Sequence, residues 1–118
     1  MDKVIDTSIG TVTISKDVIA SVVRMAATGT YGLAGMSQGL YDGLVGFFGV
    51  DTENRGVEIN LDGNELDVKL RIVVGYGTRI TMVARNVASS VRYLVKERLG
   101  ITVRRVDIIV EGVRVSGE

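Results

Sequence analysis

One short segment of this sequence has the residue types of an anion site. Gly75 and Gly77 flank Tyr76 between a strand-like run and a helix-like run, and Thr78 follows them. A helix N-terminus favours phosphate, because its free N–H groups and its dipole both attract an anion. The dinucleotide fingerprint, however, needs a third glycine where this chain has Ile80. The alternative is structural: the glycines permit a tight turn, and Thr78 is the N-cap of the helix.

Basic residues gather in the second half of the chain. The run 79–105 holds seven basic residues and one acid, Glu97, whereas the run 51–67 holds six acids and one base, Arg55. Three interpretations stay open: complementary surfaces that meet head-to-tail between copies, a basic helix that contacts RNA or anionic lipid, or an ordinary solvated helix face. The basic residues that we assign to partner binding or self-association are Arg79, Arg85, Arg92 and Lys96.

Nucleic acid is the weaker choice of partner for this basic run. The formal net charge is zero, so no global field draws the chain to a polyanion. RNA-binding modules stack bases on aromatic side chains, and of the six aromatic residues only Tyr93 lies within the run. We therefore do not expect nucleic acid binding and keep it as an alternative function.

A glycine-rich segment in the middle of the chain carries a second candidate contact surface. Its apolar residues could form a short amphipathic helix that docks a membrane-anchored partner or a neighbouring subunit. Alternatively, the same helix packs on its own domain. The apolar residues of this segment are Leu40, Leu44, Val45, Phe47 and Phe48.

The sequence lacks the residues on which most enzymes depend. It contains no His, Cys, Trp or Pro, which removes the usual general base near neutral pH, thiolate nucleophiles and zinc–thiolate sites. No D-x-D-x-D-G loop offers an all-oxygen metal site. We therefore expect no catalytic residues, no metal and no cofactor. The N-terminus does not read as a signal peptide, and no apolar run is long enough to span a bilayer, so we expect a cytoplasmic chain without a transmembrane segment of its own.

The elements of the first half are short. Residues 9–14 alternate like an edge strand. Ser15 is then the expected N-cap of a helix that ends at Gly29. Residues 31–37 (YGLAGMS) are expected to form a turn, and residues 38–55 a variable insert or loop.

The second half has a sharper pattern. Apolar residues alternate over 57–61 and 66–74 around the turn at 62–64, which predicts a β-hairpin with one buried and one wet face. Val73, and Ile109 further on, break this alternation and would fall on the wet face. They form a small contact patch unless another segment covers them.

A long helix and a last strand complete the pattern. The helix runs from Thr78 through Leu99 and ends at Gly100, and residues 106–110 alternate as the closing strand. We predict an α/β (α+β) two-layer sandwich that forms a single domain over 1–118. It has a small mixed sheet of three main strands plus a short N-terminal strand, with two main helices packed on one face. Which hairpin strand pairs with the last strand stays open.

Four stretches of the sequence resemble the alkaline-shock protein family, the envelope stress response proteins of Gram-positive bacteria. They are GTVTISKDVI, YGLAGMS, GVEINLDGNELDVKLRIVVGYGTRI and VDIIVEGVRV, and the match covers residues 9 to 115 outside the variable insert. The resemblance implies a role in cell envelope homeostasis, self-association, and a cytoplasmic position beside the membrane through a separate membrane-anchored partner. The family has no established enzymatic activity, so no catalytic residue is implied.

The function expected from these observations is a non-enzymatic scaffold or adaptor. It would form a homo-oligomer and dock a membrane-anchored protein at the cytoplasmic side of the cell membrane. A nucleic-acid-binding module that uses the basic helix, or a small-ligand-binding regulatory subunit that uses the turn at 75–78, is the alternative.

Overall fold

The central strand of the fold is β5 (Glu65–Gly75), in which every second side chain is buried. The computed structural model describes residues 2–30, 33–36 and 56–115. Because successive side chains of a strand point to opposite faces, this alternation gives the sheet one apolar face and one polar face. The buried side chains of β5 are Leu66, Val68, Leu70, Ile72 and Val74.

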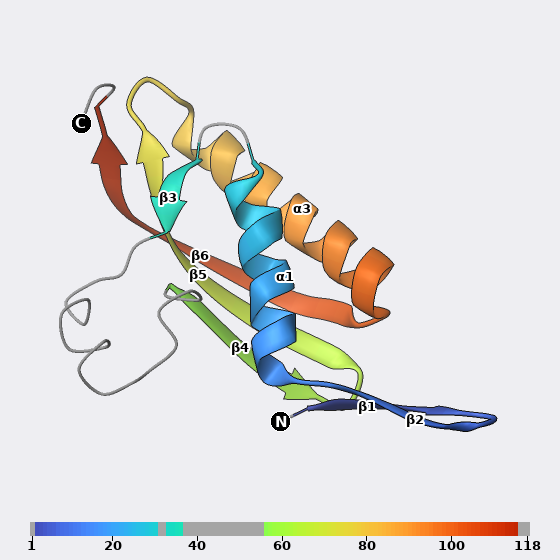
Figure 1. Ribbon diagram of the computed structural model, residues 1–118. Helices are drawn as coiled ribbons and strands as arrows, with labels where there is room; N and C mark the ends of the chain where they lie inside the picture. The colour runs from blue at the N-terminus through green and yellow to red at the C-terminus, as the bar shows by residue number, and fades with distance from the viewer. Residues whose placement is uncertain (1, 31–32, 37–55, 116–118) are drawn as a thin grey trace, which may run out of the picture.

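Four strands form the main sheet (Figure 1). β4 (Val57–Asp62) pairs antiparallel with the first half of β5, and β3 (Leu33–Met36) pairs antiparallel with its second half. β6 (Thr102–Arg114) runs parallel to β5 along its whole length. Since β6 occupies one edge of β5, β3 and β4 share the other, and the sheet is mixed.

Both helices lie on the apolar face of this sheet, where Figure 1 shows them side by side. α1 (Lys16–Thr28) begins as expected at Ser15, whose hydroxyl oxygen accepts a hydrogen bond from the Val18 N–H at 3.3 Å. α3 (Ile80–Leu99) ends at Gly100, which adopts the left-handed conformation with φ +69°. Every fourth residue of α3 faces the sheet and is buried, namely Val83, Val87, Val91 and Val95.

The expected fold class, a two-layer sandwich with two helices on one face of a mixed sheet, is confirmed. The structure also answers the open question of strand order, because β6 pairs with β5 and not with β4. A parallel neighbour needs a long crossover connection, and α3 supplies it.

Two local expectations were wrong. The strand at β2 (Gly10–Ile14) is not an edge of the main sheet but pairs antiparallel with β1 (Lys3–Thr7) in a separate hairpin. Figure 1 shows this hairpin extending beyond the main sheet at the start of α1. Part of the segment expected to turn, residues 31–37, is instead the strand β3. Its four residues, Leu-Ala-Gly-Met, carry no alternating pattern, so only the pairing with β5 reveals the strand.

Candidate interaction surface

The turn before α3 uses its threonine differently from the expectation. The Thr78 hydroxyl donates to the Gly75 carbonyl oxygen at 2.7 Å, and the N-cap position belongs to Arg79, which makes no side-chain capping bond. The prediction that Thr78 caps the helix was therefore wrong, because its hydroxyl closes the turn. Gly77 has φ +91°, so the turn does require a glycine there.

The start of α3 borders a surface hollow of about 440 Å³. Its first turn contains no acidic residue to offset the partial positive charge of the helix N-terminus. Two guanidinium groups add to that charge, so the hollow favours an anionic group of a partner. The lining residues are Arg79, Ile80, Thr81, Met82 and Arg85.

Basic side chains continue along α3 from this hollow. Arg85, Arg92 and Lys96 follow one another at seven- and four-residue spacing, which places them on one side of the helix. Arg92 Nη1 donates to the Val103 carbonyl oxygen at 3.5 Å, and Lys96 Nζ lies 3.4 Å from the Thr102 hydroxyl oxygen, so this side borders the start of β6. We call the surface formed by Arg79, Arg85, Arg92 and Lys96 the basic flank.

No described acid neutralises the basic flank. The ion pairs described here lie on the main sheet, either between strands or, for Arg105 and Asp107, within β6, and none of them involves a side chain of α3. Exposed apolar side chains stand among these cations: Met82 is 54% exposed and Tyr93 66%. Met82 was not expected in this surface, although its place one helical turn before Arg85 could have indicated it.

The acids of the run 51–67 that the structure describes are engaged elsewhere. Arg104 lies 2.6 Å from Asp67, 3.3 Å from Glu65 and 3.6 Å from Asp62. Hydrogen bonds from the Arg104 guanidinium, together with its charge, hold the pKa of Asp67 below its ordinary value and raise that of Arg104. The same carboxylate accepts two of these bonds, from Nε at 3.0 Å and from Nη2. Such bidentate pairs are the stronger kind of charged hydrogen bond.

A second group of ion pairs lies further along the same face. Arg71 contacts Glu58 at 3.4 Å and Glu111 at 3.6 Å, and Arg105 contacts Asp107 at 3.0 Å. The four described acids of the run 51–67 are therefore all paired within the chain. Two of the seven basic residues of the run 79–105, Arg104 and Arg105, are used in the same way. Within the run 79–105, the basic residues that make no ion pair with a described acid are Arg79 and those of α3.

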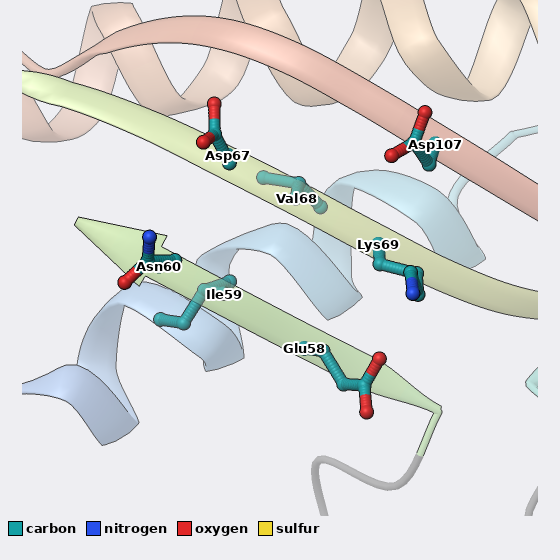
Figure 2. Close-up of a pocket in the computed structure, with 7 residues that line it drawn as sticks. All are labelled: Glu58, Ile59, Asn60, Asp67, Val68, Lys69 and Asp107. Atoms are coloured by element: carbon teal, nitrogen blue, oxygen red, sulfur yellow. The ribbon is translucent and has the colours of Figure 1, made fainter. Parts of the chain in front are cut away.

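The polar face of the sheet also has a small hollow of about 220 Å³, which Figure 2 shows between β4, β5 and β6. Glu58 and Lys69 are direct neighbours across β4 and β5, and Asp107 lies on the far strand. Asp67 and Asp107 already make ion pairs with Arg104 and Arg105. Among the residues that line this hollow, no contact joins a nucleophile to a general base. The lining residues are Glu58, Ile59, Asn60, Asp67, Val68, Lys69 and Asp107.

The two apolar residues expected on the wet face do lie there. Ile109 is opposite Arg71, and Val73 is opposite Gly112, so they are diagonal neighbours. Val73 is half-buried and Ile109 is 39% exposed. Arg71 lies directly opposite Ile109 and two residues before Val73 on the same strand, so its charged side chain borders both.

Other expected features fall outside the described residues or are limited to them. Leu40, Leu44, Val45, Phe47 and Phe48, with the whole insert 38–55, lie outside the described part of the chain. Over 2–30, 33–36 and 56–115, no group of three metal-binding side chains comes together. Within the same residues, no helix has the length and apolar character needed to cross a membrane.

Comparison with known proteins gives relatives that cover nearly the whole chain. The uncharacterized protein YloU of Bacillus subtilis is 38% identical over 112 residues, which are 93% of each chain. The uncharacterized protein Spy1614 of Streptococcus pyogenes is 29% identical over 116 residues, covering 97% of this chain and 96% of its own. YqhY of Bacillus subtilis is 27% identical over 109 residues, 92% of this chain and 81% of its own.

Solved structures share the fold. MamM-CTD superposes with a TM-score of 0.52 at 11% identity and covers 83% of this chain and 99% of its own. A copper form of MamM CTD gives the same TM-score and identity, with 98% of its chain covered. At this identity the likeness concerns the fold alone.

The family model that matches spans residues 4–115 and includes both helices, both sheets and the basic flank. Its extent agrees with the elements seen in the structure, from the N-terminal hairpin to the end of β6. This protein belongs to the alkaline shock protein 23 family, a family with a cell envelope-related function.

Proposed function

We propose that this protein is a non-enzymatic scaffold or adaptor of envelope homeostasis and envelope stress response. In this role it self-associates and docks a membrane-anchored protein at the cytoplasmic side of the cell membrane. The observation that carries the proposal is the basic flank of α3, whose cations have no acidic partner in the described chain. Membership of an envelope-related family supports the same setting.

The chemistry of the basic flank indicates what the docked segment looks like. Its cations favour acidic groups, and the exposed Met82 and Tyr93 favour apolar groups among those acids. An amphipathic segment that combines both, laid along α3, satisfies the two requirements together. The hollow at the start of α3 would receive an acidic side chain near Arg79 and Arg85.

Charge reversal on the basic flank tests the docking. Arg85→Glu with Arg92→Glu should abolish co-sedimentation of the purified protein with cell membranes, while binding by the unchanged protein persists. A matched control reverses two cations away from α3, Lys3→Glu with Lys16→Glu, and should bind normally. Both double variants change the net charge equally, so a general electrostatic effect would affect them alike.

Two further samples separate a protein partner from lipid. Membranes treated with protease should lose the binding, and protein-free vesicles of anionic lipid should not bind at all. Equal binding to the vesicles would replace the protein partner with a lipid surface. Unchanged binding by the Arg85→Glu and Arg92→Glu variant would remove the basic flank from the proposal.

Self-association is tested separately, by light scattering over a hundredfold range of protein concentration. A mass that rises with concentration supports a scaffold. If copies met head-to-tail through opposite charges, salt would lower that mass and the double reversal on α3 would dissolve the oligomer. A strict monomer under every condition would leave a small adaptor without the scaffold role.

The hollow at the start of α3 favours one alternative, a regulatory subunit that binds a small anion. Nucleotides or inorganic phosphate would then raise the melting temperature, and Arg79→Gln with Arg85→Gln would remove the effect. Nucleic acid binding through the same cations would instead give retention on heparin with a steep dependence on salt.

A further inference from the structure

The outer edge of β6 is the longest unpaired strand edge in the described chain. β6 has 13 residues and, among the described residues, pairs only with β5. Figure 1 shows it at the border of the main sheet below α3. A free edge presents a row of unpaired N–H and C=O groups, which makes it a template for another strand.

Only part of this edge is open. Arg92 and Lys96 reach over the first two residues of β6 through their contacts with Val103 and Thr102. Further along, two register shifts interrupt the pairing with β5 and bound a regular stretch at residues 105–110. An added strand can therefore pair best along this stretch.

We propose that this edge pairs with the same edge of a second copy, antiparallel about a twofold axis at Ile108. The inference rests on the self-association in the proposed function and assigns it a surface. In such a dimer every contact occurs twice, once from each copy. Two residues that face each other across the contact must have their side chains on the same face of the sheet. The axis must therefore lie where one residue faces its own counterpart, and not midway between two consecutive residues.

The regular stretch 105–110 has its middle between Asp107 and Ile108, so these two residues are the candidates for the axis, and the charges of β6 decide between them. An axis at Asp107 would set the two copies of this carboxylate against each other, which is destabilising. An axis at Ile108 instead places Asp107 opposite Ile109 of the second copy, and Arg105 opposite Glu111, which stands at the register shift just beyond the regular stretch. The last pair occurs twice in the dimer and joins opposite charges.

The existing contacts fit this arrangement. Glu111 lies on the polar face, since its carboxylate is 3.6 Å from Arg71, and Arg105 contacts Asp107 at 3.0 Å. We call the contact between the two β6 edges the β6 seam. Across it, Arg71 and Glu111 of one copy continue to Arg105 and Asp107 of the other, with alternating charge. On the other face, the partly buried Val106, Ile108 and Val110 would meet their counterparts and lose their remaining exposure.

One feature opposes the dimer. The basic flanks of the two copies would border the same seam, and like charges repel. Salt reduces this repulsion, because at physiological ionic strength the Debye length is about 8 Å. The edge-paired dimer is therefore best measured at that ionic strength.

The cysteine-free sequence allows a direct test of register. In the proposed dimer, Cα atoms of residues 107 and 109 of opposite copies lie about 4.5–5.5 Å apart, within the range of a disulfide. Residues 107 of both copies are diagonal neighbours at about 7–8 Å, beyond that range. Asp107→Cys and Ile109→Cys are therefore prepared separately, with tags of different mass, and oxidised alone and mixed. Val4→Cys, which lies on the edge strand β1 and is 54% exposed in the native chain, is the control.

The mixture should give mainly the 107–109 heterodimer, in excess of the statistical half, and the control should give little product. A strong Asp107→Cys homodimer would place the axis at 107 and overturn the proposed register. A second variant, Ile109→Asp, sets two like-charged pairs across the seam and should raise the dissociation constant by about tenfold. Val4→Asp should leave it unchanged.

The outcomes separate this inference from the proposed function. Concentration-dependent mass with the heterodimer supports both. If the mass rises with concentration but no 107–109 heterodimer forms and Ile109→Asp does not change the dissociation constant, the β6 seam is overturned and self-association remains. A strict monomer at physiological ionic strength overturns the β6 seam together with the scaffold role, and leaves only the docking adaptor of the proposed function.

Discussion

The two faces of the main sheet differ in how deeply they bury their side chains, and one isoleucine on each face can be used to measure the difference. Ile72 lies under the helices and is 0% exposed, whereas Ile109, on the polar face, is 39% exposed. Replacing either with alanine removes the same three carbon atoms. At about 0.8 kcal/mol per buried CH₂, Ile72→Ala loses roughly 2.4 kcal/mol of transfer free energy. The cavity left under two helices adds to this, for a total of about 3–4 kcal/mol.

Ile109→Ala should cost much less. About 0.6 of its surface is covered, so the transfer loss is roughly 1.5 kcal/mol, and water can fill the space that the side chain leaves. The expected difference between the variants is therefore about 2 kcal/mol. For a domain of this size, that corresponds to roughly 8 °C in melting temperature.

Urea unfolding followed by circular dichroism measures both variants on one scale. Each is run at two protein concentrations, because loss of a dimer contact would make the Ile109→Ala result depend on concentration. Equal costs for the two substitutions at both concentrations would contradict the reasoning. They would mean that the polar face is as well covered as the face beneath α1 and α3.

Three smaller tests address single features. Gly100→Ala should destabilise by about 1–2 kcal/mol because of the left-handed backbone, while Gly112→Ala, whose added methyl meets only ordinary contacts, should be nearly neutral in thermal unfolding. Ser15→Ala should cost about 1 kcal/mol by removing the cap of α1, and an unchanged melting temperature would contradict the capping role. NMR titration should place the pKa of Asp67 below its ordinary value, with the associated stability present at neutral pH and lost as the pH falls below about 4. In Arg104→Gln that pKa should return to normal; an unshifted pKa in the native chain would refute the assignment.

Much of the fold could be predicted because its core elements carry local signals. The strict alternation of β5 and the four-residue stripe of valines in α3 determine which side of each element is buried. The start of α1 and the end of α3 could also be predicted, since serine is favoured at a helix N-cap and glycine just after a helix C-terminus. Thr78 had the same local signal as Ser15 and did not cap, because the Gly75 carbonyl lies within reach of its hydroxyl.

The candidate surface was predicted less completely. Counting charges located the basic residues of α3 correctly, but the acidic run seemed equally available. Arg104 is nearly forty residues from Asp67 in the chain, and only the parallel pairing of β5 with β6 brings them to 2.6 Å. No pattern within a single element of the sequence predicts such a pair.

The sequence by itself determined the two helices, the hairpin, the two-layer class and the absence of His and Cys chemistry, because each depends on residue types and on spacing within one element. Only the tertiary structure decided that β3 joins the sheet, that β1 and β2 stay apart from it, and that β6 forms an edge. The physical reason is that strand order and ion pairing depend on contacts between distant segments. Such contacts also decide that the described acids of the run 51–67 are paired within the chain, whereas the basic residues of α3 have no described acidic partner.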